Sequence, residues 1–414
     1  MKLEEIVRKS NWDLKKISDV TFYQEGPGVR KKQYTEEGVK LLNVGNIQKG
    51  KIDLSLTDRY ISEEEAYGKY EHFLADEGDL IIACSGIQVS YFHEKIAFLK
   101  KEHLPLCMNT STMRFKSLDE GILDINYFSY FLKTNYFKKQ LQKLITGSAQ
   151  LNFGPSHIEQ IDIMLPPIKI QKKIVEVLDE AQKLIDNRKK QIELLDDLIE
   201  SIFYDMFGDP VKNNRGWEVK KLGELTSKIG SGSTPRGGES SYKKEGISLI
   251  RSMNIYDGEF VYDGLAFIDE GQASKLNNVI VLEGDVLINI TGASINRACI
   301  VPKDILPARV NQHVSILRPK KDLTSNYLVN LLISKTFKRK LYNIATSGGA
   351  TREAITKGDL ENLEIPIPPL PLQNQFANKV QAIESQKQLL EKSLKLLEDN
   401  YNSLMQRSFK GELF

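Results

Sequence analysis

Cysteine and histidine are scarce in this sequence, and their spacing excludes the frameworks that these residues build. The chain has 414 residues, with three cysteines and five histidines. Cys84, Cys107 and Cys299 share no CxxC spacing and leave an odd count, which favours a reducing cytosol over a disulfide-bonded scaffold. We expect all three to be small core residues. The histidines show no metal-ligand spacing, so the sequence predicts no metal site.

Long apolar runs are also missing. No segment approaches the ~18 consecutive apolar residues that a membrane-spanning helix needs. The opening stretch, MKLEEIVRKS, is charged from its second residue and lacks the apolar run of a secretory signal. We therefore expect a cytoplasmic protein with no membrane partner.

Motifs for nucleotide or methyl-donor chemistry are absent. The run Gly230-Ser-Gly-Ser-Thr-Pro does not end in the Gly-Lys-[Ser/Thr] of a P-loop, and no GxGxxG opens a helix after a strand. The two Pro-Pro pairs are followed by Ile168 and Leu370, not by the aromatic residue of an amino-methyltransferase motif. We expect no catalytic residues and no cofactor.

A large excess of one charge is missing as well. The formal net charge is +2, and residues 209–369 hold 22 Lys and Arg against 18 Asp and Glu. DNA-binding proteins often carry a stronger basic excess. A DNA-binding role would therefore depend on local basic clusters, or on a partner that supplies much of the phosphate contact.

What the sequence does contain is a repeat of about 202 residues. Leu165-Pro166-Pro167 returns as Ile367-Pro368-Pro369, and Trp12 and Gly78-Asp79 match Trp217 and Gly284-Asp285. A period of half the chain indicates two copies of one unit. We predict five segments in the order extension, domain, helix, domain, helix, with the bounds 1–10, 11–166, 167–208, 209–368 and 369–414.

The segment after each Pro-Pro pair has a coiled-coil pattern. Apolar residues recur with alternating steps of three and four over 168–208 and 370–410, and a Pro-Pro pair marks each helix start. A single narrow apolar stripe needs a partner, so we predict that the two helices pair antiparallel, with residues 1–10 near the end of the second helix. Arg188 and Lys387 interrupt the stripe and either fix its register or extend solvated stems. The alternative is two independent helices that bind other subunits.

Each globular copy reads as a mixed α+β unit. Short β-branched runs at 41–44, 80–83, 279–282 and 286–290 lie between glycine-containing turns. Apolar residues at helical spacing predict one helix over 126–144 and another over 326–344. The predicted fold class is α+β, with two repeated mixed domains and two long helices.

Polar loops occupy equivalent places in the two copies, and their side chains differ. Arg, Asn, Gln, Ser and Thr match the donors and acceptors of base edges, although the same residue types also dominate ordinary turns. Lys338-Arg339-Lys340 either grips phosphates or forms a solvated helix face. The candidate DNA contacts are Arg30, Lys31, Lys32, Asn46, Gln88, Asn109, Ser148, Gln150, Arg236, Asn254, Thr291, Asn296, Arg297, Asn311, Gln312, Thr351 and Arg352.

These features together resemble the specificity (S) subunit of type I restriction-modification systems. The resemblance covers essentially the whole chain. It is carried by Trp12 and Trp217, by Thr291-Gly292 with the later Asn311-Gln312, by the Pro-Pro pairs with Gln171 and Gln373, and by Ser408-Phe-Lys-Gly-Glu-Leu at the end. The first copy departs from the second, because it has Cys84-Ser85-Gly86 and no arginine matching Arg297.

The resemblance implies two target recognition domains that each read one half of a bipartite, asymmetric site in double-stranded DNA. It also implies long helices that act as a spacer and dock methyltransferase (M) subunits, with restriction (R) subunits joining to form the endonuclease, and no catalysis by the chain itself. The candidate docking residues are Ile174, Leu178, Ile185, Leu195, Ile383, Leu390 and Leu397. Two alternatives stay open: a coiled-coil scaffold that never touches DNA, and a relative of single-chain restriction-methyltransferases without its catalytic domain.

Overall fold

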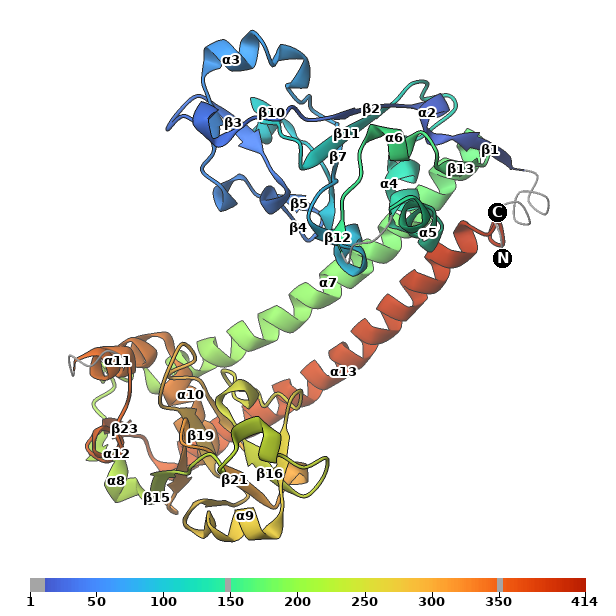
Figure 1. Ribbon diagram of the computed structural model, residues 1–414. Coiled ribbons are helices and arrows are strands. Elements are labelled where there is room, and N and C mark those ends of the chain that lie inside the picture. Colours follow the sequence, from blue (N-terminus) through green and yellow to red (C-terminus); the bar gives the residue numbers. More distant parts are fainter. Residues whose placement is uncertain (1–11, 146–149, 348–352) are drawn as a thin grey trace. The chain divides into compact units, whose positions relative to one another are not determined.

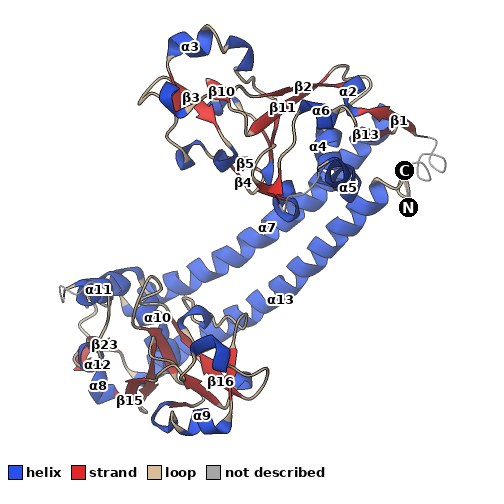
Figure 2. Ribbon diagram, in the orientation of Figure 1, coloured by secondary structure: helices blue, strands red, loops and turns tan. Residues whose placement is uncertain are grey.

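The computed structural model describes residues 12–145, 150–347 and 353–414 and confirms the predicted fold class (Figures 1 and 2). The chain divides into two compact units. Unit 1 comprises residues 1–187 and 394–414, and unit 2 comprises residues 188–393. Each unit therefore contains one globular copy together with part of both long helices.

Two sheets form the body of unit 2. One is antiparallel and has the order β15 (Thr226–Ser231), β22 (Val314–Pro319), β19 (Val286–Asn289), β20 (Ala298–Ile300). The other has the order β17 (Ala266–Ile268), β16 (Ile247–Ile250), β21 (Ala308–Val310), β18 (Ile280–Val281), and its central strands β16 and β21 run parallel. Strand β19 is buried along its whole length, including its polar last residue, Asn289.

Unit 1 repeats this arrangement, with three strands in place of four in its second sheet. Its antiparallel sheet has the order β2 (Thr21–Glu25), β11 (Thr112–Ser117), β7 (Leu80–Ala83), β9 (Ile96–Phe98). Its second sheet has the order β10 (Leu106–Met108), β3 (Val39–Leu42), β6 (Tyr60–Ile61), with β10 and β3 parallel. The strands predicted at 80–83 and 286–290 are confirmed, whereas those at 41–44 and 279–282 are shifted or shortened to β3 and β18.

The tryptophan and Pro-Pro motifs mark the two ends of each copy. Strand β1 (Asp13–Lys16), directly after Trp12, pairs with β13 (Asp162–Leu165), which ends at the first Pro-Pro pair. Strand β14 (Glu218–Lys221) pairs in the same way with β23 (Glu364–Ile367). The paired first and last strands close each copy before its long helix begins.

The single helices predicted over 126–144 and 326–344 are wrong, because each is broken in the middle. The first divides into α4 (Ile125–Lys133) and α5 (Asn135–Leu144), and the second into α10 (Ser325–Ile333) and α11 (Lys335–Thr346). The dividing residues, Thr134 and Ser334, have extended backbones. The Thr134 hydroxyl accepts a hydrogen bond from the backbone N–H of Phe137 and so caps the second helix. The helical spacing of apolar residues continues across the break, so the sequence pattern does not show where one helix ends and the next begins.

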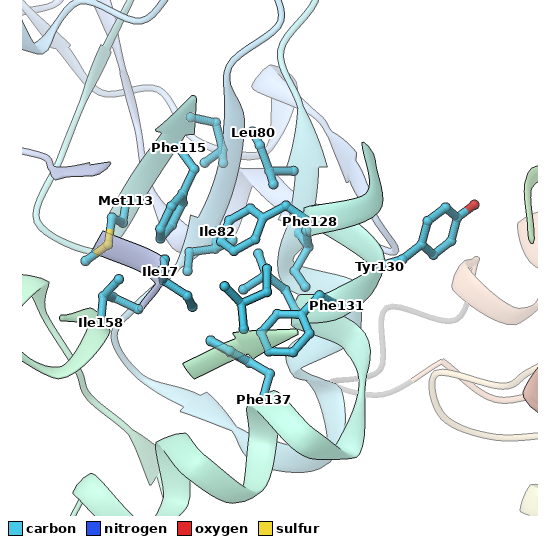
Figure 3. Close-up of a cluster of buried hydrophobic side chains, with 14 of the residues drawn as sticks. Ile17, Leu80, Ile82, Met113, Phe115, Phe128, Tyr130, Phe131, Phe137 and Ile158 are labelled. Atoms are coloured by element: carbon cyan, nitrogen blue, oxygen red, sulfur yellow. The ribbon is translucent and has the colours of Figure 1, made fainter. Parts of the chain in front are cut away.

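Aromatic and aliphatic side chains fill the core of unit 1 between these helices and the antiparallel sheet. Figure 3 shows Phe128, Phe131 and Phe137 meeting Ile82 and Phe115 from the strands. Tyr130 points away from this cluster, and its hydroxyl donates a hydrogen bond to Asp179 on the long helix. The helix pair is thereby fastened to the first long helix as well as to the sheet.

The long helices are α7 (Ile168–Phe207) and α13 (Leu370–Ser408), within two residues of the predicted bounds. Their pairing inside unit 2 is antiparallel: Phe203 and Phe207 pack on Phe376, whereas the earlier Asp196 of α7 meets the later Lys387 of α13. The Lys387 ammonium lies 2.7 Å from the Asp196 carboxylate, which favours a register-fixing role for this lysine. Arg188 instead donates a hydrogen bond to Gln191 of its own helix.

The prediction for the cysteines is confirmed. Cys84, Cys107 and Cys299 are buried free thiols. Burial raises the pKa of each thiol to about 12, so all three stay protonated at neutral pH.

Candidate nucleic-acid interface

Four polar loops of unit 2 leave from the same end of its two sheets. Ser231 and Asn289, the last residues of β15 and β19, lie opposite Ser315 and Val314 at the start of β22. In the second sheet the parallel strands β16 and β21 end side by side at Ile250 and Val310. The loops 232–238, 251–254, 290–297 and 311–313 therefore start from one edge.

A hydrogen-bond network joins three of these loops. The Thr234 hydroxyl donates to Oε1 of Gln312, and Nε2 of Gln312 lies 3.1 Å from Nε2 of His313. The other ring nitrogen of His313, Nδ1, lies 2.5 Å from the Thr291 hydroxyl. Gln312 is exposed, whereas Thr234, His313 and Thr291 are half-buried. Thr234 and His313 thus hold the exposed Gln312 amide directly, and Thr291 in turn holds the His313 ring.

Gly232 makes this convergence possible. A Cβ atom at this position would overlap the carbonyl oxygen of Val310 and press on Val279. Its backbone N–H donates to the carbonyl of Asn311 over 3.1 Å. Only glycine lets the 232–238 loop approach the end of β21 this closely.

Three arginines lie in the loops at this edge. Arg297 lies over the ring of the exposed Tyr256, with 4.3 Å between the guanidinium carbon and the ring centroid. Arg251 packs over Tyr242 and pairs with Glu239 at 3.2 Å. Arg236 is exposed. This edge therefore combines hydrogen-bonding amides and hydroxyls with positive charge, which is the chemistry that contacts DNA bases and phosphates.

The matching edge of unit 1 has the same frame and different side chains. Nδ2 of Asn109 donates to Oδ1 of Asn43 over 3.0 Å, which joins the loops after the parallel strands β10 and β3. The Ser85 hydroxyl donates to Asn152, joining two further loops. Gly26 approaches Asn109 as Gly232 approaches Val310: an added Cβ would lie 2.5 Å from the Asn109 carbonyl oxygen. The exposed candidates here are Arg30, Lys31, Lys32 and Gln88.

The structure corrects the role predicted for two asparagines. Asn46 and Asn254 are completely buried. Oδ1 of Asn46 accepts from the backbone N–H of Asn43, and its Nδ2 donates to the Asp53 carbonyl. Asn254 makes the matching bonds to Arg251 and Val261. The expectation that these two residues contact DNA is wrong, because their amides already brace their own loops.

Three further candidate asparagines are more than nine-tenths buried and shape their loops in a similar way. Asn109 and Asn311 bond to neighbouring loop residues, and the Asn311 side chain accepts from the backbone N–H of His313. Asn296 has a left-handed backbone with a φ of 70°, and its amide donates to the Lys338 carbonyl. These residues position the exposed side chains beside them.

Four candidates have no described side chain. Ser148, Thr351 and Arg352 lie outside the described residues. Only the backbone of Gln150 is described, and it pairs with Gln88 between β12 (Gln150–Leu151) and β8 (Ile87–Gln88). The proposal that these four residues contact DNA therefore depends on the sequence.

The basic run on α11 divides between the two roles considered for it. Lys338 pairs with Asp257, and Lys340 donates to the Glu364 carbonyl over 3.0 Å. Burial lowers the pKa of the Lys340 ammonium, because desolvation disfavours its charged form. Arg339 is exposed. Two of these three cations are thus engaged by the chain itself.

The docking residues predicted in the helix seam are also corrected. Ile174, Leu178, Ile185 and Ile383 are buried, so they cannot present a surface to another subunit. Leu195 packs partly buried against the core of unit 2, and Leu390 and Leu397 are half-buried. The exposed leucines of the long helices are instead Leu184, Leu194, Leu198, Leu370, Leu389 and Leu396.

Sequence reasoning missed Thr234, His313 and Tyr256 as members of the interface. The first two lie in loops that the repeat had singled out, and His313 directly follows Gln312. The adjacency of His313 to Gln312 could have suggested that both residues belong to the interface. The bonds that join them cross up to 78 residues of sequence, and no local pattern shows such contacts.

Within the described residues, no group of three or more His, Cys, Asp or Glu residues is placed to hold a metal ion. No helix in that part of the chain is both long and apolar enough to cross a bilayer.

The repeated frame and its paired loop edges define a two-domain recognition protein, and comparison with known proteins gives its family. The model of the type I restriction modification DNA specificity domain matches residues 9–196 and again 214–399. The chain belongs to this family.

Individual relatives extend over nearly the whole length. The MjaIX specificity subunit of Methanocaldococcus jannaschii is 24% identical, over 97% of this chain and 94% of its own. The EcoKI specificity subunit of Escherichia coli K12 is 22% identical, over 97% and 89%. A solved chain from a study of type I R-M complex assembly matches with a TM-score of 0.60 at 18% identity, covering 97% of this chain and 98% of that one. The S subunit from M. genitalium matches at 0.51 and 15%, covering 96% of both chains.

Proposed function

We propose that this chain is the DNA-recognition subunit of a type I restriction-modification complex. Residues 11–166 and 209–368 act as target recognition domains, and each reads one half of a bipartite, asymmetric site in double-stranded DNA. One observation carries the proposal: the same sheet edge presents hydrogen-bonding loops in both copies, with unlike side chains. Thr110 occupies the place in unit 1 that Gln312 occupies in unit 2. Two copies that share one fold but differ in their contact side chains are suited to reading two half-sites of different sequence.

The chemistry on DNA belongs to partner subunits in this proposal. The interface offers amides, hydroxyls and arginines, which bind and orient nucleic acid. Methyltransferase subunits supply methyl transfer, and restriction subunits, where present, supply cleavage. Docking of the methyltransferase is assigned to the exposed leucines of α7 and α13, because Leu194 and Leu198 lie one turn apart and Leu389 and Leu396 lie two turns apart, so each helix exposes a short apolar stripe.

The test is base-resolution methylation mapping of cells that express the chain with its neighbouring methyltransferase. We expect one bipartite motif with two unlike halves and a fixed spacer. The purified chain without partners should methylate nothing. Methyl transfer by the isolated chain would support a single-chain enzyme, and failure of the assembled complex to shift any DNA would support a scaffold.

Arg236 provides a sharper arm of the same test. Arg236→Ala should weaken recognition of one half-site by ~1–3 kcal/mol if the guanidinium bonds a base in bidentate fashion. Lys275→Ala is the matched control, because Lys275 is an exposed cation of unit 2 after helix α9 (Glu270–Ser274), outside the four loops. An equal loss on unrelated DNA would reassign Arg236 to phosphate contact.

A further inference from the structure

The Gln312 side chain is held in one orientation while its outer edge stays open. Thr234 donates to Oε1, and the His313 ring engages Nε2. With its proton on Nδ1, the His313 ring donates to the Thr291 hydroxyl and accepts from Gln312 through Nε2. An amide has two oxygen lone pairs and two N–H donors, so one acceptor and one donor remain on the exposed edge of Gln312.

We propose that Gln312 reads an adenine in the half-site recognised by unit 2, and that Thr234, His313 and Thr291 are its positioning residues. This inference rests on the proposed function. Adenine presents its N6 donor and N7 acceptor together in the major groove, and the free edge of a glutamine amide complements that pair. Guanine presents two acceptors in the major groove, so the glutamine amide can form only one of the two hydrogen bonds with it.

The supporting bonds explain why this residue gives selectivity and not only affinity. A free glutamine can turn its amide over and offer the opposite pattern. Here, rotation would bring the amide oxygen against the accepting Nε2 of His313, so the His313 ring sets the orientation while the Thr234 hydroxyl holds the amide in place. The fixed side chain also loses less rotamer freedom on binding than a mobile one.

The matched position in unit 1 has different chemistry. Thr110 has a short hydroxyl side chain, and its backbone N–H bonds to Oδ1 of Asn109. A threonine contacts either kind of base edge and specifies less than a bidentate amide. The adenine contact proposed for Gln312 therefore has no counterpart at this position of unit 1.

The experiment uses the complex of the full chain with its methyltransferase partner. Once methylation mapping has given the motif, binding is measured on duplexes in which each adenine of each half-site is replaced in turn by 7-deaza-adenine, which lacks the N7 acceptor. Replacement of one particular adenine, in one half-site only, should lower the DNA affinity of the wild-type complex by roughly 5- to 100-fold. With Gln312→Ala, that same replacement should have little further effect, and mapping should show a degenerate base at that position.

Variants of the supporting residues separate positioning from folding. Thr234→Val, which removes the hydroxyl, should relax the same base position, and Thr234→Ser, which keeps it, should restore selectivity. Thr110→Ala in unit 1 is the matched control and should leave this position unchanged. Thermal melting of each purified chain should match the wild type.

The outcomes are distinguishable from failure of the proposed function. If the wild-type complex methylates no bipartite motif, the proposed function fails. If the motif exists but Gln312→Ala leaves it intact, or weakens binding to every sequence equally, this inference alone is overturned. Relaxation at a guanine position would also overturn it.

Discussion

Gly232 and Gly26 show at the residue scale how a single missing side chain shapes a recognition edge. Both allow the loop after the first strand of the antiparallel sheet to touch the turn after the parallel strands. The close approach, and not an unusual backbone angle, requires glycine at these positions. The supports of Gln312 depend on the same approach, because Thr234 lies two residues beyond Gly232.

Gly232→Ala should accordingly destabilise unit 2 and displace Thr234. We expect a loss of ~1–3 kcal/mol in the free energy of unfolding, since the methyl group has no space beside the Val310 carbonyl. The control is Gly230→Ala, where an added Cβ meets only the flexible end of Lys228 at 3.5 Å. The measurement is the urea midpoint of both variants. Equal midpoints would show that the loop accommodates the methyl group without cost.

Some residue-level roles could be predicted from the sequence, and others could not. The polar loops that the repeat singled out do meet at one edge of each unit. The same residue types hid the buried braces Asn46 and Asn254, since an asparagine that caps a turn and one that reads a base look alike in sequence. The network around Gln312 needed the folded positions of three loops.

At the element scale, two matched glutamines anchor the long helices. Gln171 accepts from the backbone N–H of Asp124 and donates to the carbonyls of Ile122 and Pro166. Gln373 makes the same three bonds to Thr324, Asp322 and Pro368. Both glutamines are completely buried. Each helix start is thereby bonded to the loop before the α4 or α10 helix of its own copy.

Gln373→Leu should therefore loosen unit 2 alone, and Gln171→Leu should loosen unit 1 alone. Loss of the amide leaves a buried N–H and two carbonyls without their partner, at about 1–3 kcal/mol for each group left unsatisfied. Hydrogen exchange of peptides from β19 and β22, against peptides from β7 and β11, measures the two units separately. Gln375→Leu, at an exposed position of the same helix, is the control. Equal loss of protection in both units would contradict independent anchoring.

Elements were predicted well where one physical signal dominated. The Pro-Pro pairs and the heptad pattern located both long helices within two residues, because proline stops and a sustained apolar period are local properties. The breaks at Thr134 and Ser334 were missed, since apolar spacing continues across them. The heptad pattern also placed Ile174 and Leu178 on a docking surface, although the same stripe is what the chain buries.

At the scale of the whole molecule, the repeat couples two readers to one pair of helices. Phe409, near the end of the chain, stacks on Tyr127 in unit 1, and its counterpart Phe207 packs on Tyr327 in unit 2. Each unit thus completes its core with a phenylalanine from the far end of a long helix. Both long helices are divided between the two units, so helix length is tied to the integrity of both recognition domains.

Helix length should then set the spacer of the DNA site. Deleting one heptad from the middle of each long helix removes about 10 Å of helix while keeping the apolar stripe nearly in phase. We expect methylation mapping to show both half-sites unchanged and a spacer shortened by about 3 base pairs, at ~3.4 Å each. Because 3 base pairs also rotate one half-site by about 100° relative to the other, the shortened chain should methylate more weakly than the wild type. Deleting the heptad from one helix only is the control, which should disrupt helix pairing and abolish recognition. A spacer that stays unchanged after the paired deletion would show that the helices do not set the distance between the half-sites.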